Sequence, residues 1–146
     1  MSMLNDNTTD AANRLLTAIA KEFPELKWST YLYIDEGWDH EVIILDEAIV
    51  FRFPTDNEYT AKLKHEIAVL ESLRNKLGVC IPKYKYIAKH SAFGGYKLIK
   101  GQQLTKTRFS EIQSSGQALV AEQLAEFLST IHRQVLNDEP FASVSP

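Results

Sequence analysis

The spacing of hydrophobic positions changes several times along this chain, and each change predicts a new element. Residues 11–23 carry large apolar side chains three and four positions apart, which predicts an amphipathic helix with Asp10 as its N-cap and Pro24 beyond its end. From residue 28 to residue 54 the period shortens to two, and three runs (WSTYLYID, EVIIL and IVFRFP) are rich in aromatic and β-branched residues. Short polar breaks separate these runs, so they predict an antiparallel three-stranded meander.

A helical period returns after the third run and predicts a long helix. Residues 58–78 place apolar side chains at intervals of three and four, with a charged face opposite. The apolar positions are Leu63, Ile67, Leu70, Leu73 and Leu77. Gly78 is a natural stop for this helix. Because a twisted antiparallel sheet needs a cover on one face, we expect this helix to cover the sheet.

Two shorter extended pieces and a final helix complete the pattern. Residues 83–88 (KYKYIA) and 95–100 (GYKLIK) are predicted as strands, and Gly101 follows the second. Residues 117–135 predict a helix whose apolar side carries Leu124, Phe127, Leu128, Ile131 and Val135. Strands and helices are segregated along the chain rather than strictly alternating, which favours an α+β fold over a doubly wound parallel sheet.

Composition and charge narrow the class of protein. The chain has 146 residues, of which 45% are hydrophobic and 24% charged, so one globular domain with a real core is the simplest expectation. A net charge of −3 argues against nucleic acid as a partner. The single cysteine, Cys80, excludes an internal disulfide framework and a multi-cysteine zinc site. With no apolar run long enough to span a membrane and no visible secretory signal, we expect a cytoplasmic protein without a membrane partner.

Arg52 is the most informative polar residue of the predicted sheet. It lies between Phe51 and Phe53 and therefore points to the opposite face of the strand. A charge in the middle of an apolar strand needs a partner or a ligand, and Glu66 on the long helix could be that partner. Such a pair could present its positive charge to a nucleotide phosphate. The alternative is a solvent-facing arginine, with Glu66 as one of several exposed carboxylates of the helix.

Other motifs are ambiguous from the residue pattern alone. The bend at Gly37 could gather backbone N–H groups around a phosphate, or it could be an ordinary hairpin turn. Lysines alternate with tyrosines over residues 83–89, which is typical of a nucleic-acid stacking surface but equally of a strand whose lysines face water and whose tyrosines face the core. The four histidines show no metal-binding spacing, and Cys80 is expected to be an inert thiol.

Taken in order, several of these segments resemble one family. The resemblance to the aminoglycoside phosphotransferases runs from about Trp28 to His132 and is carried by GWDHEVIILDEAIVFRFP, LKHEIAVLESL, IPKYKYI, GYKLIKGQQLT and QLAEFLSTIH. That family has the protein-kinase-like fold. The resemblance implies a nucleotide-binding N-lobe over residues 1–101, built as an antiparallel five-stranded sheet covered by the long helix and preceded by the N-terminal helix. Residues 102–146 would then form the hinge, the crossover and the first helix of an incomplete C-lobe.

The same resemblance implies roles for individual positions. The loop over the nucleotide phosphates would be formed by Gly37, Trp38, Asp39 and His40. Relatives often have Asn where His40 stands. Arg52 would touch the phosphates, with Glu66 as its partner. Tyr96 would stand at the back of the base pocket. The hinge whose backbone meets the purine would be formed by Lys97, Leu98 and Ile99.

The catalytic loop of that family, H-x-D-x-x-x-x-N, has no counterpart in this sequence, where His132 is followed by Arg133 and Gln134. The resemblance therefore implies ATP or GTP with Mg²⁺ as the bound cofactor, but no catalytic residue and no metal ligand in these 146 residues. Phosphoryl transfer needs both metal ions and a carboxylate that orients the attacking hydroxyl. Two origins stay open, an amino-terminal part of a larger kinase or a naturally short protein that kept the nucleotide lobe alone.

These considerations leave functions from different classes. The first is the nucleotide-binding portion of a small-molecule kinase that would transfer a γ-phosphoryl group to a hydroxyl of an aminoglycoside-like substrate, which implies antibiotic resistance. The alternative is a non-catalytic nucleotide-binding or protein-interaction module of the same fold, and a structural domain without a ligand remains if the resemblance is accidental. Large apolar side chains on residues 117–135 would each contribute about 1.5–3 kcal/mol when covered. We therefore expect that helix either to self-associate or to fold back onto the sheet.

Overall fold

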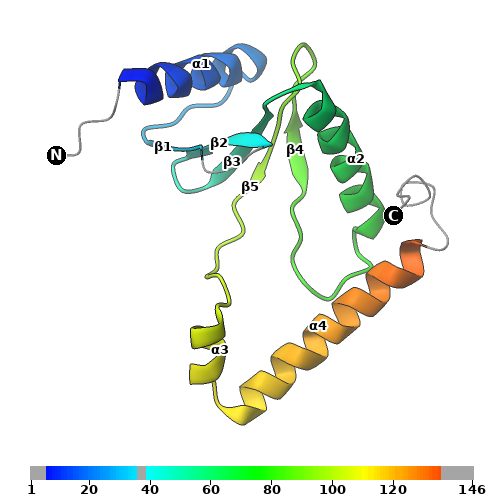
Figure 1. Cartoon of the computed structure of the whole chain (residues 1–146). Helices are drawn as coiled ribbons and strands as arrows, with labels where there is room; N and C mark the ends of the chain where they lie inside the picture. The colour runs from blue at the N-terminus through cyan, green and yellow to red at the C-terminus, as the bar shows by residue number, and fades with distance from the viewer. Residues whose placement is uncertain (1–5, 36–38, 136–146) are drawn as a thin grey trace. The chain divides into compact units, whose positions relative to one another are not determined.

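Four helices and five strands make up the part of the chain that the computed structural model describes, residues 6–35 and 39–135 (Figure 1). The helices are α1 (Asp6–Glu22), α2 (Asn57–Leu73), α3 (Lys106–Glu111) and α4 (Ser114–Val135). The strands are β1 (Tyr31–Ile34), β2 (His40–Leu45), β3 (Ile49–Pro54), β4 (Tyr84–Ile87) and β5 (Gly94–Lys97). Neighbouring strands all pair antiparallel in the order β1-β2-β3-β5-β4. The expected α+β class, the three-stranded meander and the five-stranded antiparallel sheet are confirmed.

The chain divides into two compact units. The first unit consists of Met1–Ile67 and Pro82–Leu98 and holds the sheet, α1 and the first part of α2. The second consists of Ala68–Ile81 and Ile99–Pro146 and holds the end of α2 with α3 and α4. One of the passages between the units therefore falls between Leu98 and Ile99, directly after β5.

One face of the sheet packs against α1 and forms the hydrophobic core of the first unit. Alternate residues of β2 and β3 point to this face, and α1 contributes residues at helical spacing. The core consists of Ala12, Leu15, Ile19, Ile43, Leu45, Phe51, Phe53 and Phe93. Phe51 lies at its centre with 0% of its surface exposed. The N-terminal helix thus builds the core itself, in addition to preceding the sheet as expected.

Two adjacent glycines let β5 approach the side chains on both faces of the sheet. Gly95 lies opposite Phe51 in the β3–β5 register, and a Cβ at Gly95 would come within 2.6 Å of the Phe51 ring. A Cβ at Gly94 would come within 2.8 Å of the Tyr84 ring on the other face. Any larger residue at these positions would therefore displace an aromatic ring.

The second face of the sheet carries Arg52 and is covered by the first turns of α2. This helix begins after Asp56, whose Oδ1 accepts a hydrogen bond from the backbone N–H of Tyr59 at 3.0 Å, as a helix N-cap does. Leu63, one turn further along, is buried. Glu66 reaches Arg52 on β3, so the expected cover of the sheet by the long helix is confirmed.

Two predicted helix ends were wrong. α1 begins at Asp6 rather than after Asp10, because no glycine or proline between them stops the helix from extending. α2 ends at Leu73, well before Gly78, because Asn75 adopts a left-handed backbone conformation with φ of 63°. Asparagine tolerates that conformation better than most residues, so it can end a helix where a glycine would be expected.

The second unit contains a short helix that the sequence pattern did not predict. α3 begins after Thr105, whose side chain accepts a hydrogen bond from the backbone N–H of Arg108 at 3.2 Å. α4 follows, and a cavity of about 110 Å³ separates part of it from the segment after α2. Lys76 of that segment donates a hydrogen bond to Gln134 of α4 at 2.9 Å.

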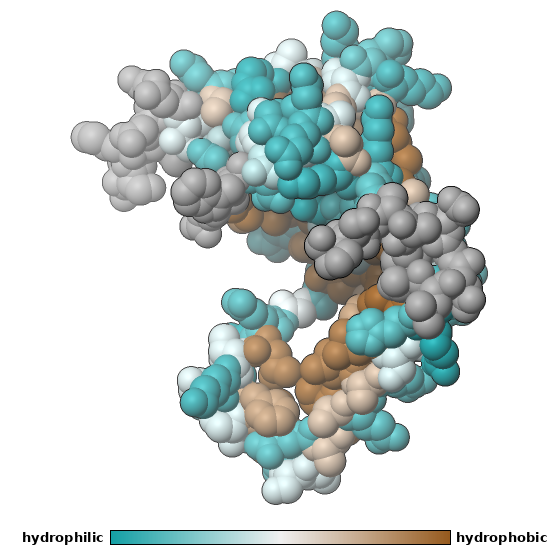
Figure 2. Space-filling model, turned by 45° about the vertical axis from the view of Figure 1, so that its right-hand side comes forward, coloured by the Kyte–Doolittle hydropathy of each residue, from teal (hydrophilic) through white to brown (hydrophobic). Residues whose placement is uncertain are grey.

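Part of the apolar side of α4 is exposed. Leu124 and Leu128 expose 54% and 43% of their surface, whereas Phe127 and Ile131 are half-buried. Leu119, on another side of α4, exposes 55%. Figure 2 shows apolar surface gathered along the segment that carries α3 and α4. No helix within residues 6–35 and 39–135 is both long enough and apolar enough to cross a membrane.

Candidate functional site

Side chains from four strands and α2 meet on the sheet face opposite the core. Arg52 lies opposite Val42 of β2 and Gly94 of β5, and Tyr84 lies opposite Tyr96. Directly opposed residues of antiparallel strands share one face, so the register brings their side chains together. We call this group the Arg52 cluster; it consists of Asp39, His40, Arg52, Glu66, Tyr84 and Tyr96.

The predicted ion pair between Arg52 and Glu66 is confirmed. Nη1 of Arg52 donates to both carboxylate oxygens of Glu66, at 2.6 Å and 2.7 Å. The two side chains expose 24% and 34% of their surface, so the pair is partly shielded from water. Burial by itself disfavours the charge on Arg52, but Tyr84 and Glu66 together raise its pKa above the ordinary value. The alternative of a solvent-facing arginine is therefore wrong.

Two tyrosines stand beside this ion pair. The Tyr84 hydroxyl lies 3.4 Å from Nη1 of Arg52, and its ring meets the ring of Tyr96 edge-on with centroids 5.0 Å apart. Burial, with the charge of Glu66, raises the pKa of Tyr84 to about 12. Burial also raises the pKa of Tyr96, against the opposing effect of Arg52. Both phenols therefore keep their protons at neutral pH and form an uncharged wall next to a fixed cation.

His40 and Asp39 close the cluster on the other side. Nδ1 of His40 lies 3.1 Å from Oδ2 of Asp39 and 3.4 Å from Nη2 of Arg52. Partial burial would raise the pKa of Asp39, but when His40 is protonated its charge and hydrogen bond outweigh burial and lower that pKa. Two of the four residues predicted for the phosphate loop, Asp39 and His40, thus lie next to the residue predicted to touch the phosphates, Arg52.

The predicted hinge begins at the last residue of β5, Lys97, and continues beyond the strand. Lys97 is exposed and pairs with Ile49, and the Leu98 N–H donates to the carbonyl of Ala48 at 2.8 Å. That N–H is thus used to extend the sheet. Ile99, 43% exposed, begins the second compact unit. A role of this segment in meeting a purine stays a prediction.

Two of the predicted loop residues, Gly37 and Trp38, lie outside the described residues. Their expected place over a nucleotide therefore also stays a prediction. Within the described ranges, no group of three or more histidine, cysteine, aspartate or glutamate side chains could hold a metal ion.

Tyr84 is the member of the cluster that the sequence pattern missed. Simple alternation predicts that Tyr84 and Tyr86 share the core face, but they point to opposite faces. Tyr84 pairs with Tyr96, whereas Tyr86 pairs with Gly95, because the register shifts between the two tyrosines. Such an irregularity reverses the face of every residue that follows it. The ring of Tyr86 instead packs on Phe51 with centroids 5.6 Å apart. The sequence signal that could have revealed this register shift is the pair of adjacent glycines, Gly94 and Gly95, in the strand that pairs with Tyr84 and Tyr86.

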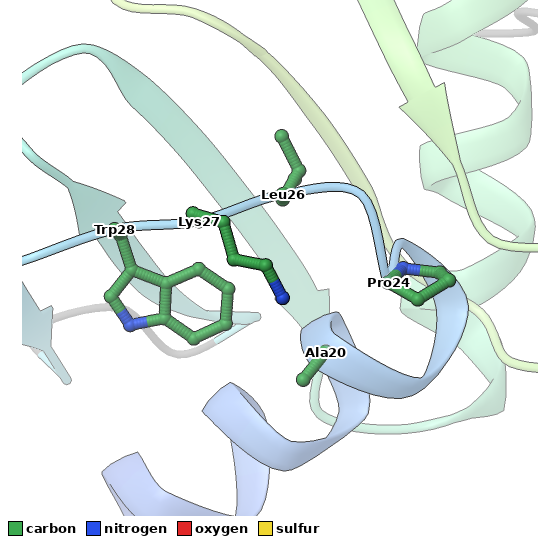
Figure 3. Close-up of a pocket in the computed structure, with 5 residues that line it drawn as sticks. All are labelled: Ala20, Pro24, Leu26, Lys27 and Trp28. Carbon is green, nitrogen blue, oxygen red and sulfur yellow. The ribbon is translucent and has the colours of Figure 1, made fainter.

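A separate cavity of about 360 Å³ lies between the end of α1 and the connection to β1 (Figure 3). Its lining residues are Ala20, Pro24, Leu26, Lys27 and Trp28. In Figure 3 the side chains of Lys27 and Trp28 extend toward Ala20, and that of Leu26 extends the other way. Lys27 is the one charged group in this lining, so the cavity offers no pair of groups for acid–base chemistry.

Comparison with known proteins gave no match to a family model and none to a curated protein sequence. Solved structures do match. The aminoglycoside phosphotransferase APH(2")-IIIa, solved with GDP and kanamycin, is 31% identical with a TM-score of 0.73 over 80% of this chain and 40% of its own. A GDP complex of wild-type aminoglycoside 2'-phosphotransferase-IIIa is 25% identical, with a TM-score of 0.71 over 91% of this chain and 54% of its own.

A macrolide 2'-phosphotransferase, MphH from Brachybacterium faecium, is similar in fold alone. It is 21% identical, with a TM-score of 0.55 over 67% of this chain and 35% of its own. The fold is therefore that of a protein-kinase-like phosphotransferase. Over the part that they share, the chain resembles the aminoglycoside phosphotransferases in fold and sequence, and it spans about 40% of the length of the first of them.

Proposed function

We propose that the Arg52 cluster is the phosphate end of a nucleotide site in a small-molecule kinase. The kinase would transfer a γ-phosphoryl group to a hydroxyl of an aminoglycoside-like substrate. The observation that carries this proposal is the ion pair between a strand arginine and a helix glutamate, which holds a cation on a defined surface of the sheet. In protein kinases a strand cation paired with a helix glutamate serves the nucleotide phosphates. Several of the matched aminoglycoside phosphotransferases were solved with GDP, ADP or ATP, which supports the same assignment.

Each residue of the cluster has a proposed task. Arg52 donates to phosphate oxygens through Nη2, because Nη1 is taken by Glu66. Tyr96 stands at the back of the base pocket, and the purine meets the backbone of residues 97–99. Gly37 and Trp38, with Asp39 and His40, form the loop over the phosphates. The nucleotide binds as its Mg²⁺ complex, with metal ligands that this chain does not supply.

We further propose that the 146 residues bind nucleotide without turning it over. The sequence holds no H-x-D-x-x-x-x-N segment, and a carboxylate that orients the acceptor hydroxyl is required for transfer. The residues that bind the acceptor and those of the catalytic loop would belong to sequence beyond these residues. The matched structures include complexes with GDP and kanamycin, with ATP and streptomycin, and with gentamicin, which supports an aminoglycoside-like acceptor for the whole enzyme.

The test is direct binding of MgATP and MgGTP to the purified chain by isothermal titration calorimetry. We expect saturable binding of at least one of them, and a weakening of at least about tenfold in Arg52→Ala, because a hydrogen bond to a charged group is worth roughly 1.5–3 kcal/mol. Arg14→Ala is the matched control, because Arg14 also pairs with a sheet glutamate, Glu41, but is 64% exposed and outside the cluster. Equal affinities of the two variants would refute the proposed site.

The alternative is a non-catalytic nucleotide-binding or protein-interaction module, which predicts the same nucleotide binding. The two candidates differ in what they predict for the gene sequence after codon 146. A reading frame that continues past Pro146 into an H-x-D-x-x-x-x-N segment favours the kinase. A natural stop there, with nucleotide binding retained, favours the module.

A further inference from the structure

His40 is the polar residue that the sheet buries most completely within the described ranges. Its surface is only 6% exposed, at the first position of β2 opposite Pro54 of β3. Its Nε2 has no hydrogen-bond partner among the described residues and no contact with solvent. A buried imidazole without a full set of hydrogen-bond partners costs stability, so the position of His40 calls for an explanation.

Nδ1 of His40 faces two partners that make opposite demands. The guanidinium of Arg52, 3.4 Å away, can only donate, so it needs Nδ1 without a proton. The carboxylate of Asp39, 3.1 Å away, can only accept, so it needs Nδ1 with a proton. One nitrogen cannot satisfy both at once. The proton on Nδ1 therefore decides whether His40 holds Arg52 or Asp39.

Charged and titratable groups surround this imidazole on several elements. Asp39 precedes it, Arg52 reaches it from β3, and the Tyr59 ring of α2 lies 6.3 Å away, centroid to centroid. Further along α2, Glu66 pairs with Arg52. Lys62 pairs with Glu58, whose hydrogen bond raises the pKa of Lys62, and the charge of Asp39 raises it further. Each cation therefore already has a carboxylate close to it. An added anion would favour the protonated, positively charged form of the His40 imidazole.

We propose that His40 is a positioning residue for Arg52, and that it couples the binding of nucleotide phosphates to the uptake of a proton. The proposal rests on the nucleotide site proposed above. In the free protein the bare Nδ1 accepts from Nη2 of Arg52 and keeps the guanidinium in place. A phosphate oxygen replaces Nδ1 as the acceptor of Nη2. Nδ1 then takes a proton from solvent and donates it to Asp39.

The sign of the effect follows from linkage. A complex that holds one more proton than its free components becomes tighter as the pH falls. The affinity for nucleotide therefore rises as the pH falls through the range in which the imidazole gains its proton. An asparagine at this position cannot take up a proton. A chain with His40 therefore binds nucleotide with a pH dependence that the same chain with asparagine lacks.

The experiment measures the binding of a non-hydrolysable MgATP or MgGTP analogue to the whole chain from pH 5.5 to 8.5. At pH 7 the calorimetry is repeated in two buffers of different ionisation enthalpy, which counts the protons taken up. We expect the affinity for the analogue to fall about tenfold as the pH rises from 5.5 to 8.5, and a fraction of one proton to be taken up on binding at pH 7. In His40→Asn both effects shrink to what the analogue's own phosphate contributes, whereas in His132→Asn, an exposed histidine of α4, they persist.

Parallel pH profiles in the wild type and in His40→Asn would overturn the inference and leave the nucleotide site intact. No binding of either nucleotide at any pH would overturn the nucleotide site itself. If His40→Asn fails to fold, the two-buffer measurement on the wild type decides alone, because binding enthalpies that are equal in both buffers exclude proton uptake.

Discussion

Both carboxylate oxygens of Glu66 approach the same nitrogen of Arg52, Nη1, whereas the second terminal nitrogen, Nη2, faces Nδ1 of His40. Glu66 therefore holds the guanidinium through Nη1 and leaves Nη2 directed toward His40. An arginine held in this way has little freedom to lose when it meets an anion, so its orientation contributes to affinity. Glu66 acts through Arg52 and not on a ligand itself.

Glu66→Gln removes the charge that orients Arg52 but keeps the size of the side chain. We expect nucleotide affinity to fall about three- to tenfold, with stability lower by roughly 1 kcal/mol because the pair is partly exposed. Calorimetric titration and urea unfolding measure the two effects. Glu71→Gln is the control, since Glu71 pairs with Arg74 within one turn at the surface of α2. Unchanged nucleotide affinity in Glu66→Gln would show that Arg52 does not need this partner.

Gly95→Ala tests the close approach of β5 to the core. The added Cβ would lie within 2.6 Å of the Phe51 ring, which is 0% exposed and cannot move without disturbing its neighbours. We expect the free energy of unfolding to fall by about 1–3 kcal/mol. Gly101→Ala is the matched control, because no atom lies within 4 Å of the position a Cβ would take there. Urea unfolding of both variants gives the comparison, and equal stabilities would contradict the packing.

Much of this arrangement could be predicted from the sequence because period-two alternation holds over β2 and β3. Alternation placed Phe51 and Phe53 on one face and Arg52 on the other, and the helical spacing of α2 placed Glu66 within reach of Arg52. Both strands run without irregularity in their mutual register. A local pattern is sufficient wherever the backbone repeats regularly.

The rest could not be predicted because it depends on departures from regular backbone geometry. The register shift between Tyr84 and Tyr86 sends one ring to Arg52 and the other to the core. Asn75 ends α2 through a single left-handed residue. Neither feature leaves a periodic trace, since each involves one position and its contacts with distant strands.

Glu22 provides a prediction about acid stability. Its carboxylate, at the end of α1, accepts from the backbone N–H groups of Lys89 at 3.2 Å and His90 at 2.9 Å, which ties α1 to the β4–β5 connection. Burial acts to raise the pKa of Glu22, but these hydrogen bonds and His90 lower it below the ordinary value of 4.5. A carboxyl whose pKa is lower in the folded state adds stability above its ordinary pKa and loses it as the pH falls through the folded value.

Glu22→Gln should therefore be less stable than the wild type at pH 7, and the difference should narrow as the pH falls below about 4.5. Urea unfolding at pH 7 and at pH 3.5 measures both points. Glu25→Gln, an exposed glutamate just beyond the helix, should show no such narrowing. A difference between Glu22→Gln and wild type that stays constant with pH would mean that the charge of Glu22 does not hold the connection.

Self-association through α4 stays a prediction, and the exposed leucines make it testable. Leu124 and Leu128 lie one turn apart and expose 54% and 43% of their surface, so a second copy of this chain could cover both. We expect the sedimentation coefficient of the wild type to rise with concentration, and that of a Leu124→Glu, Leu128→Glu double variant to stay at the monomer value, because burying a charge in such a contact is costly. Ala118→Glu adds a charge at an exposed position on another side of α4 and should leave the association intact. A wild type that stays monomeric at high concentration would exclude this contact, and association that persists in the double variant would assign it to another surface.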